Sequence, residues 1–251
     1  MNLKLENKSV VVIGGSRGIG LSIVEGFLDE KARVSIIARN ISDKLKSQLI
    51  KEGNQVNFYE GDATDKKSLI SISKLILKKS QDIDVVVANV GNGKASLASL
   101  QSDNDWEESW NINFKSALNS ANIFLPIINT LGSFTFISSI AGKEYLGAPN
   151  SYSVAKSAIN TLMKSFSHKF GSKLRVNTIS PGNVIFKKSR WEELLTESPE
   201  KVKKMLEVKV PLKRFGTPEE IANAVVFVSS PRASFISGAS INVDGGQTIS
   251  Y

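Results

Sequence analysis

Tyr152 and Lys156, one helical turn apart, are the residues in this sequence best suited to moving a proton. They lie in Y-S-V-A-K at the start of an apparent helix, so both side chains share one face. A neighbouring ammonium favours the phenolate, and bringing a phenol pKa from about 10 to about 7 requires roughly 4 kcal/mol. We therefore expect Lys156 to lower the pKa of Tyr152, although a Tyr-x-x-x-Lys pair by itself is common.

Ser139 is a third polar residue expected close to Tyr152 and Lys156. It ends F-T-F-I-S-S, an apolar run that predicts a buried strand, and so it lies at the carboxyl edge of a sheet. From that edge its hydroxyl can hydrogen-bond a substrate oxygen beside the phenol. The chain has no cysteine and one histidine, His168, inside an apparent helix. Thiol chemistry and Cys-based zinc sites are thereby excluded and a Ser-His-Asp relay is disfavoured, so the base must be Tyr, Lys, Asp or Glu.

A second group of residues near the start of the chain is suited to binding a phosphate. Val10 to Ile13 form an unbroken β-branched run, typical of a strand buried on both faces. Gly14, Gly18 and Gly20 follow, and helical apolar spacing begins at Ile19. A strand, a glycine turn and a helix aim unpaired N–H groups and the positive end of a helix dipole at one point. This arrangement predicts an anion site.

The rest of the chain alternates strands with helices. Further strands are predicted at 33–38, 56–59, 84–88, 133–138, 174–179 and 240–243, and helices at 42–51, 65–79, 103–129, 151–170 and 219–228. This alternation predicts an α/β fold, a Rossmann-type doubly wound parallel sheet of about seven strands with helices on both faces. We expect one domain, residues 1–251, with ligands bound beyond the carboxyl ends of the strands.

Composition narrows the classes of partner. The 251 residues are 41% hydrophobic, and no apolar run reaches membrane length, so we expect a cytoplasmic protein with no membrane partner. The net charge of +8 permits an anionic ligand. The lysines are nevertheless spread along helices, and no nucleic-acid-binding motif occurs. We therefore expect no nucleic acid partner, and no metal site.

The glycine turn, with the spacing G-x-x-x-G-x-G, and S-S-I-A-G followed by Y-x-x-x-K together resemble the short-chain dehydrogenase/reductase family. The likeness is greatest to members such as 3-oxoacyl-acyl-carrier-protein reductases and sugar dehydrogenases. It continues through R-V-N-T-I-S-P-G (175–182), P-L-K-R-F-G-T-P-E-E-I-A (211–222) and I-S-G-A-S-I-N-V-D-G-G (236–246), in family order over the whole chain. Ile13 and Phe186 stand where the family usually has threonines.

The resemblance implies an enzyme that transfers a hydride between a nicotinamide cofactor and a carbonyl or secondary alcohol. Tyr152 would be the general acid/base, Ser139 would orient the substrate oxygen, and Lys156 would tune Tyr152 and bind the nicotinamide ribose. Asn113, in N-I-N-F-K-S-A, would hold a relay water, with Asn111 as the alternative. The cofactor-binding residues implied by the resemblance are Gly14, Ser16, Arg17, Gly18, Ile19, Gly20, Arg39, Asp62, Ala63, Asn89, Gly91, Tyr152, Lys156, Pro181, Gly182 and Val184.

The residue after the second strand predicts which nucleotide binds. A carboxylate there holds the ribose hydroxyl of NAD, whereas an arginine accommodates the 2′-phosphate of NADP. This chain has Arg39 at that place and Arg17 in the glycine turn. A planar guanidinium can donate two hydrogen bonds to one phosphate. The sequence therefore predicts NADP(H) over NAD(H).

The segment at about 183–212 corresponds to the substrate-binding lid of the family. An amphipathic helical pattern follows Pro199, and Lys187, Lys188, Arg190 and Trp191 precede it. These residues could hold an anionic substrate, either carrier-linked or a nucleotide-sugar, or they could form a solvated face with Trp191 as a packing anchor. The resemblance also implies a homo-oligomer, a tetramer or dimer. A non-catalytic nucleotide-binding or scaffold protein that keeps the fold is the alternative function.

Overall fold

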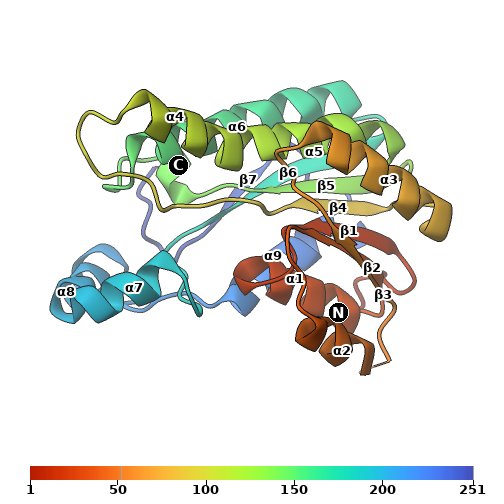
Figure 1. The fold of residues 1–251 in the computed structure, drawn as a ribbon, viewed down its shortest axis with the longest axis horizontal. Helices are drawn as coiled ribbons and strands as arrows, with labels where there is room; N and C mark the ends of the chain where they lie inside the picture. Colours follow the sequence, from red (N-terminus) through yellow and green to blue (C-terminus); the bar gives the residue numbers. More distant parts are fainter. Residues whose placement is uncertain (52, 251) are drawn as a thin grey trace.

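The computed structural model describes residues 1–51 and 53–250, and within them seven strands form one parallel sheet (Figure 1). The strands are β1 (Ser9–Ile13), β2 (Arg33–Ala38), β3 (Val56–Glu60), β4 (Val85–Ala88), β5 (Gly132–Ile137), β6 (Leu174–Pro181) and β7 (Ser240–Val243). Their order, β3-β2-β1-β4-β5-β6-β7, reverses direction between β1 and β4. The predicted doubly wound α/β sheet is confirmed. Residues 52 and 251 of the predicted domain lie outside the described residues.

Helices cover both faces of this sheet (Figure 1). One face carries α1 (Gly18–Asp29), α2 (Asp43–Lys51) and α9 (Pro218–Ser229), and the other carries α3 (Lys66–Ser80), α4 (Asp103–Trp110), α5 (Ser116–Phe124) and α6 (Asn150–Phe170). Val10 and Val12 pack in the core under α1 and α9, whereas Val11 and Ile13 pack under α3 and α5. The unbroken apolar runs follow from this, because successive strand residues enter two different cores. None of the described helices is long and apolar enough to cross a membrane.

The helix predicted over 103–129 is interrupted. A π-helical turn, Asn111–Lys115, separates α4 from α5, and a short 3₁₀ turn, Leu125–Ile127, follows α5. The side-chain amide of Asn113 donates to the Ser109 carbonyl at 3.0 Å, competing for an acceptor that the α-helical ladder would use. Pro126, which lacks an N–H group, accompanies the change of geometry after α5. Hydrophobic spacing does not reveal either break.

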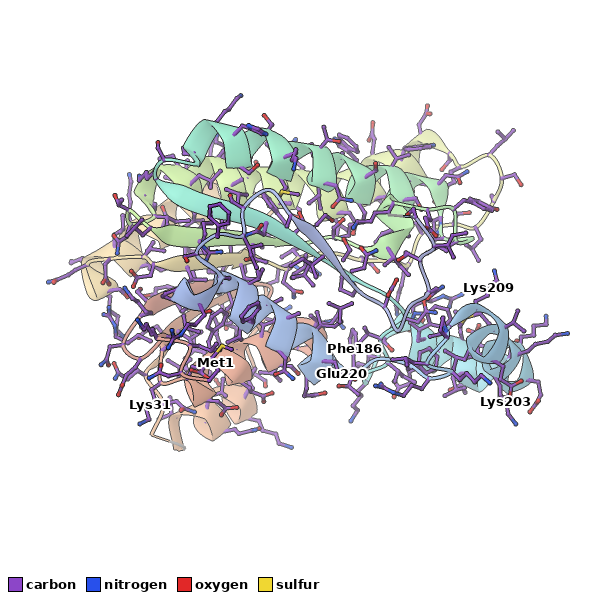
Figure 2. The ribbon with its side chains drawn as sticks, turned by 180° about the vertical axis from the view of Figure 1, so that it is seen from behind. Met1, Lys31, Phe186, Lys203, Lys209 and Glu220 are labelled. Atoms are coloured by element: carbon purple, nitrogen blue, oxygen red, sulfur yellow. The ribbon has the colours of Figure 1, made fainter. Side chains whose placement is uncertain are left out.

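The segment after β6 forms two helices that stand apart from the sheet, α7 (Arg190–Glu197) and α8 (Pro199–Lys209) (Figure 1). The sequence predicted only the helix after Pro199. Figure 2 shows Lys203 and Lys209 on α8, with Phe186 closer to the body of the molecule. Val202 is buried, and the rings of Trp191 and Phe215 lie 5.4 Å apart. This packing holds α7 and α8 beside the carboxyl edge of the sheet.

Candidate active site

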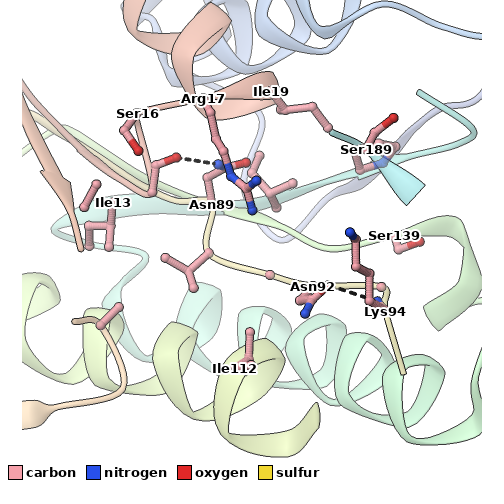
Figure 3. A pocket seen from close by; sticks show the side chains of 18 of the residues that line it. Ile13, Ser16, Arg17, Ile19, Asn89, Asn92, Lys94, Ile112, Ser139 and Ser189 are labelled. Atoms are coloured by element: carbon pink, nitrogen blue, oxygen red, sulfur yellow. Dashed lines mark hydrogen bonds between the residues drawn. The ribbon is translucent and has the colours of Figure 1, made fainter. Parts of the chain in front are cut away.

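A cleft of about 700 Å³ opens where the loops after the strands meet (Figure 3). The register of β1 pairs Ile13 with Ile37 and Ala88, so the loops that follow these strands begin at one edge. Of the residues predicted from sequence, the cleft is lined by Gly14, Ser16, Arg17, Ile19, Arg39, Asp62, Ala63, Asn89, Gly91, Ser139, Tyr152, Lys156, Pro181, Gly182 and Val184. The predicted catalytic and cofactor-binding residues outside this lining are Gly18, Gly20 and Asn113.

The glycine turn brings backbone groups to the cleft. Gly14 has a φ of 87°, its carbonyl accepts from the Asn89 side-chain amide at 2.9 Å, and its N–H donates to the Ile37 carbonyl at 2.7 Å (Figure 3). A Cβ at Gly20 would overlap the Gly14 carbonyl oxygen, so this glycine lets α1 pack directly on the turn. The N-cap of α1 is Arg17, whose side chain has no acceptor and leaves the first-turn N–H groups without a side-chain cap. The start of α1 can therefore receive an anion.

The side of the cleft after β2 and β3 carries arginines and one fixed carboxylate. Arg39 follows β2 and Arg17 projects from the glycine turn, and both line the cleft. The Asp62 carboxylate accepts from the Thr64 N–H and hydroxyl, each at 2.8 Å. Among the described lining residues Asp62 is the acidic one, and it follows β3, not β2. Two guanidiniums and one carboxylate that is already hydrogen-bonded thus line this side, so it can bind a phosphate.

The opposite side brings Ser139, Tyr152 and Lys156 together. The Lys156 ammonium lies 5.8 Å from the centroid of the Tyr152 ring and donates to the Ile137 carbonyl at 3.1 Å. The Ser139 hydroxyl accepts from the Ala141 N–H at 3.2 Å, which fixes it at the end of β5. A hydroxyl, a phenol and an ammonium thus face one space. This set can orient an oxygen and exchange a proton with it.

Burial sets the direction of the pKa shifts of Tyr152 and Lys156. Burial raises the pKa of the phenol, and hydrogen bonding with Ser139 opposes this shift. Burial also lowers the pKa of Lys156 to about 8, because its side chain is only 3% exposed. The sequence-based expectation of a lowered phenol pKa counted the positive nicotinamide ring of a bound cofactor beside Lys156, so it stays a prediction for the enzyme with its cofactor bound. A neutral phenol is suited to giving a proton away.

Asn113 lies behind the cleft. Its side-chain oxygen accepts from the Asn92 N–H at 2.8 Å, and its amide donates to the Asn92 carbonyl at 3.0 Å. A Cβ at Gly91 would lie 2.9 Å from the Lys156 ammonium and 3.2 Å from the Asn113 side-chain oxygen. Gly91 therefore sits against both side chains. Asn111, the alternative assignment, is exposed, whereas Asn113 is fully buried.

The mouth of the cleft holds residues that sequence reasoning missed. Asn92 and Lys94 continue the loop after Gly91, and Lys94 forms an ion pair with Glu193 of α7. Their position directly after a predicted site glycine was the available signal. The predicted Lys188, Arg190 and Trp191 also line the cleft, whereas Lys187 does not. The ring of Phe186 packs against Gly18, where a Cβ would lie 2.5 Å from it.

Comparison with known proteins identifies the family of this chain. The family model described as "Enoyl-(Acyl carrier protein) reductase" matches residues 13–248. This chain belongs to the short-chain dehydrogenase/reductase family. Its relatives include isoepoxydon dehydrogenase of Penicillium expansum, 35% identical over 96% of this chain and 95% of that protein. Another is 3-oxoacyl-[acyl-carrier-protein] reductase of Chlamydia trachomatis, which is 34% identical over 96% of this chain and 98% of that protein.

Solved structures of the same family share the whole fold. L-sorbose reductase of Gluconobacter frateurii, solved with NADPH and L-sorbose, has a TM-score of 0.90, 27% identity and full coverage of both chains. 7α-hydroxysteroid dehydrogenase, solved with NADH and 7-oxo glycochenodeoxycholic acid, has a TM-score of 0.88 and 25% identity over 99% of this chain and 98% of that chain. This short-chain dehydrogenase/reductase is therefore an enzyme that acts on CH–OH or C=O groups with a nicotinamide cofactor.

Proposed function

We propose that this enzyme is an NADP(H)-dependent carbonyl reductase, reversible as an alcohol dehydrogenase, in which Tyr152 exchanges the proton. One observation carries the proposal. A cleft that holds Ser139, Tyr152 and Lys156 on one side carries Arg17 and Arg39 on the other. Reduction of a carbonyl by a phosphorylated dinucleotide requires a proton donor and a phosphate site in one continuous space.

The described residues fit a dinucleotide. The N–H groups at the start of α1 would hold the pyrophosphate. Gly20 keeps the glycine turn packed on this end of the helix, since a Cβ there would overlap the Gly14 carbonyl oxygen. Arg17 and Arg39 would hold the 2′-phosphate, Asp62 the adenine, and Lys156 the nicotinamide ribose. The other proposed contacts come from Ser16, Ile19, Ala63, Asn89, Gly91, Pro181, Gly182 and Val184. A bound nicotinamide supplies or accepts the hydride.

The side chains of the protein handle the proton and the oxygen. The Ser139 hydroxyl would donate a hydrogen bond to the substrate carbonyl oxygen, and the neutral Tyr152 phenol would give that oxygen its proton. The Lys156 ammonium would stabilise the phenolate left behind, because in this buried setting a charge interacts more strongly than in water. Asn113, buried against Gly91 and near Lys156, would fix a relay water. In the oxidative direction the same groups would act in reverse.

The proton role is tested with Tyr152→Phe, with Tyr145→Phe as the matched control. Tyr145 lies in the loop before α6 and is 90% exposed. NADPH oxidation is followed with a panel of carbonyl compounds, and NADPH binding by titration calorimetry. We expect Tyr152→Phe to lose about 10²- to 10⁴-fold in kcat with NADPH affinity kept, and Tyr145→Phe to match the wild type. NADPH binding by the wild type without turnover of any carbonyl would favour the non-catalytic scaffold.

The preference for NADP(H) is tested separately with Arg39→Ala. A charge-assisted hydrogen bond to phosphate contributes about 1.5–3 kcal/mol, so the NADPH dissociation constant should rise roughly 10- to 100-fold. The NADH dissociation constant should change less than twofold. Arg232→Ala, which removes an exposed arginine bonded to the Asn2 carbonyl, is the control. Equal losses of affinity for both nucleotides would refute the phosphate role.

We further propose that the substrate carries an anionic group. Lys188, Arg190 and Trp191 line the mouth of the cleft, and Glu193 pairs with both Lys94 and Arg190. A substrate anion would compete with Glu193 for these cations. Glu193→Gln should therefore lower KM for anionic carbonyls and leave KM for matched neutral ones unchanged. An equal change in both would contradict an anionic substrate.

The segment 183–212 is proposed to be a lid, and the protein a homo-oligomer. Lys94 of the loop after β4 and Glu193 of α7 join two walls of the cleft, as a closed lid would. Hydrogen exchange in α7 and α8 should slow on addition of NADPH and substrate. Light scattering after size-exclusion chromatography should give a dimer or tetramer mass, and a monomer mass would refute the oligomer.

A further inference from the structure

The helix that carries Tyr152 is capped from a distant part of the chain. Its N-cap residue is Pro149, which makes no side-chain cap bond to α6. The side-chain oxygen of Gln101 instead accepts from the Ser151 N–H at 2.7 Å. Gln101 is half-buried and precedes α4, fifty residues earlier in the sequence. An unpaired N–H in the first turn is thereby satisfied by a long-range acceptor.

Gln101 is itself held in place. Its side-chain amide donates to the Ser96 carbonyl at 2.8 Å, within the loop after β4. The same loop reaches the buried Asn113 through Asn92 and reaches α7 through Lys94. The capped residue, Ser151, directly precedes Tyr152. One side chain therefore links a loop that lines the cleft to the first turn of the proton-transfer helix.

We propose that Gln101 is a positioning residue, an uncharged cap that sets the first turn of α6 and through it the phenol of Tyr152. The inference rests on the proposed function of Tyr152. A small displacement of a reacting group is costly in rate, so loss of the cap should act on kcat more than on substrate binding. It should do so although Gln101 is not among the residues that line the cleft.

The absence of charge on the Gln101 side chain affects the stability of a Tyr152 phenolate. The start of a helix favours negative charge in its first turn, where a Tyr152 phenolate would lie. A carboxylate on the same N–H would cap α6 equally well but would oppose that phenolate. The charged residues that line the cleft with the phenol are Lys156, Lys94, Lys188, Arg190, Arg17, Arg39 and Asp62, and Glu193 of α7 pairs with Lys94 and Arg190. Lys143 and Glu144 follow β5, and α4, which contacts α6, carries Asp103, Asp105, Glu107 and Glu108. Further along α6 are Lys164, His168 and Lys169. A glutamine adds no charge to this set.

Two variants separate capping from charge. Gln101→Met keeps the length of the side chain and removes the acceptor, whereas Gln101→Glu keeps the acceptor and adds a charge. Ser102→Ala is the control, because it removes the N-cap of α4 one residue away and leaves α6 capped. The readouts are kcat and KM for a carbonyl turned over by the wild type, the pH profile of alcohol oxidation, and exchange of the Ser151 amide by NMR.

Gln101→Met should lower kcat about tenfold with KM within twofold, and should speed exchange of the Ser151 amide about tenfold. Gln101→Glu should restore slow exchange and most of kcat, and should move the oxidation profile to higher pH by about half a unit. Ser102→Ala should lower thermal stability and leave all three readouts unchanged. If Gln101→Met behaves like Ser102→Ala, or Gln101→Glu leaves the pH profile in place, this inference is wrong and the proposed function stands. A wild type that turns over no carbonyl refutes both.

Discussion

Replacing Lys156 by methionine is expected to stabilise the folded protein at neutral pH while removing its activity. Burial holds the pKa of Lys156 at about 8, against an ordinary value of 10.5. A difference of this size corresponds to about 3 kcal/mol. Below pH 8 the lysine is charged in both the folded and unfolded states, so the folded state bears the full cost of burying the charge. Between pH 8 and 10.5 the folded state releases its proton first, so stability rises with pH.

The assay is urea unfolding of both proteins from pH 6.5 to 10.5. The stability advantage of Lys156→Met should shrink by about 3 kcal/mol between pH 7 and 10.5. Lys164→Met is the control, because Lys164 is an exposed residue on the same helix whose ammonium also bonds one carbonyl, that of Gly238. Lys164→Met leaves Lys156 buried, so it should keep the wild-type rise in stability between pH 8 and 10.5. A difference between Lys156→Met and the wild type that does not change with pH would refute the reasoning from burial.

Two other substitutions test the packing of the turn and an exposed ion pair. Gly20→Ala should lower the free energy of unfolding by about 1–3 kcal/mol and weaken NADPH binding, because the added methyl overlaps the Gly14 carbonyl. Gly93→Ala is the control and should change the stability little, because its Cβ would have its nearest neighbour at 4.0 Å. The Arg214 guanidinium holds the pKa of Glu220 at about 2, so the stabilisation by Glu220 is present above pH 4.5 and is lost as pH falls through 2. Arg214→Gln should therefore unfold at a higher pH in an acid titration followed by circular dichroism, and an unchanged midpoint would contradict this.

The strands and the strand-end loops could be predicted because their signals are local. The run from Val10 to Ile13 is apolar at every residue since alternate side chains enter opposite cores, and this pattern is readable without coordinates. The helix predicted over 103–129 was wrong in its continuity, because the break depends on the side chain of Asn113. The helix α7 was missed because its residues are mostly polar and none of them is buried.

The amino-acid sequence by itself determined which groups were available for chemistry. A chain without cysteine and with one histidine leaves Tyr, Lys, Asp and Glu as candidate bases, and the one-turn spacing of Tyr152 and Lys156 places a phenol and an ammonium on one face. Only the tertiary structure decided how far these groups are buried and which distant side chains hold their helix in place. Burial raises the pKa of Tyr152 and lowers that of Lys156, and the cap on α6 comes from Gln101, fifty residues away. Spacing along a helix is a local property, whereas desolvation and long-range hydrogen bonds depend on which distant segments pack together.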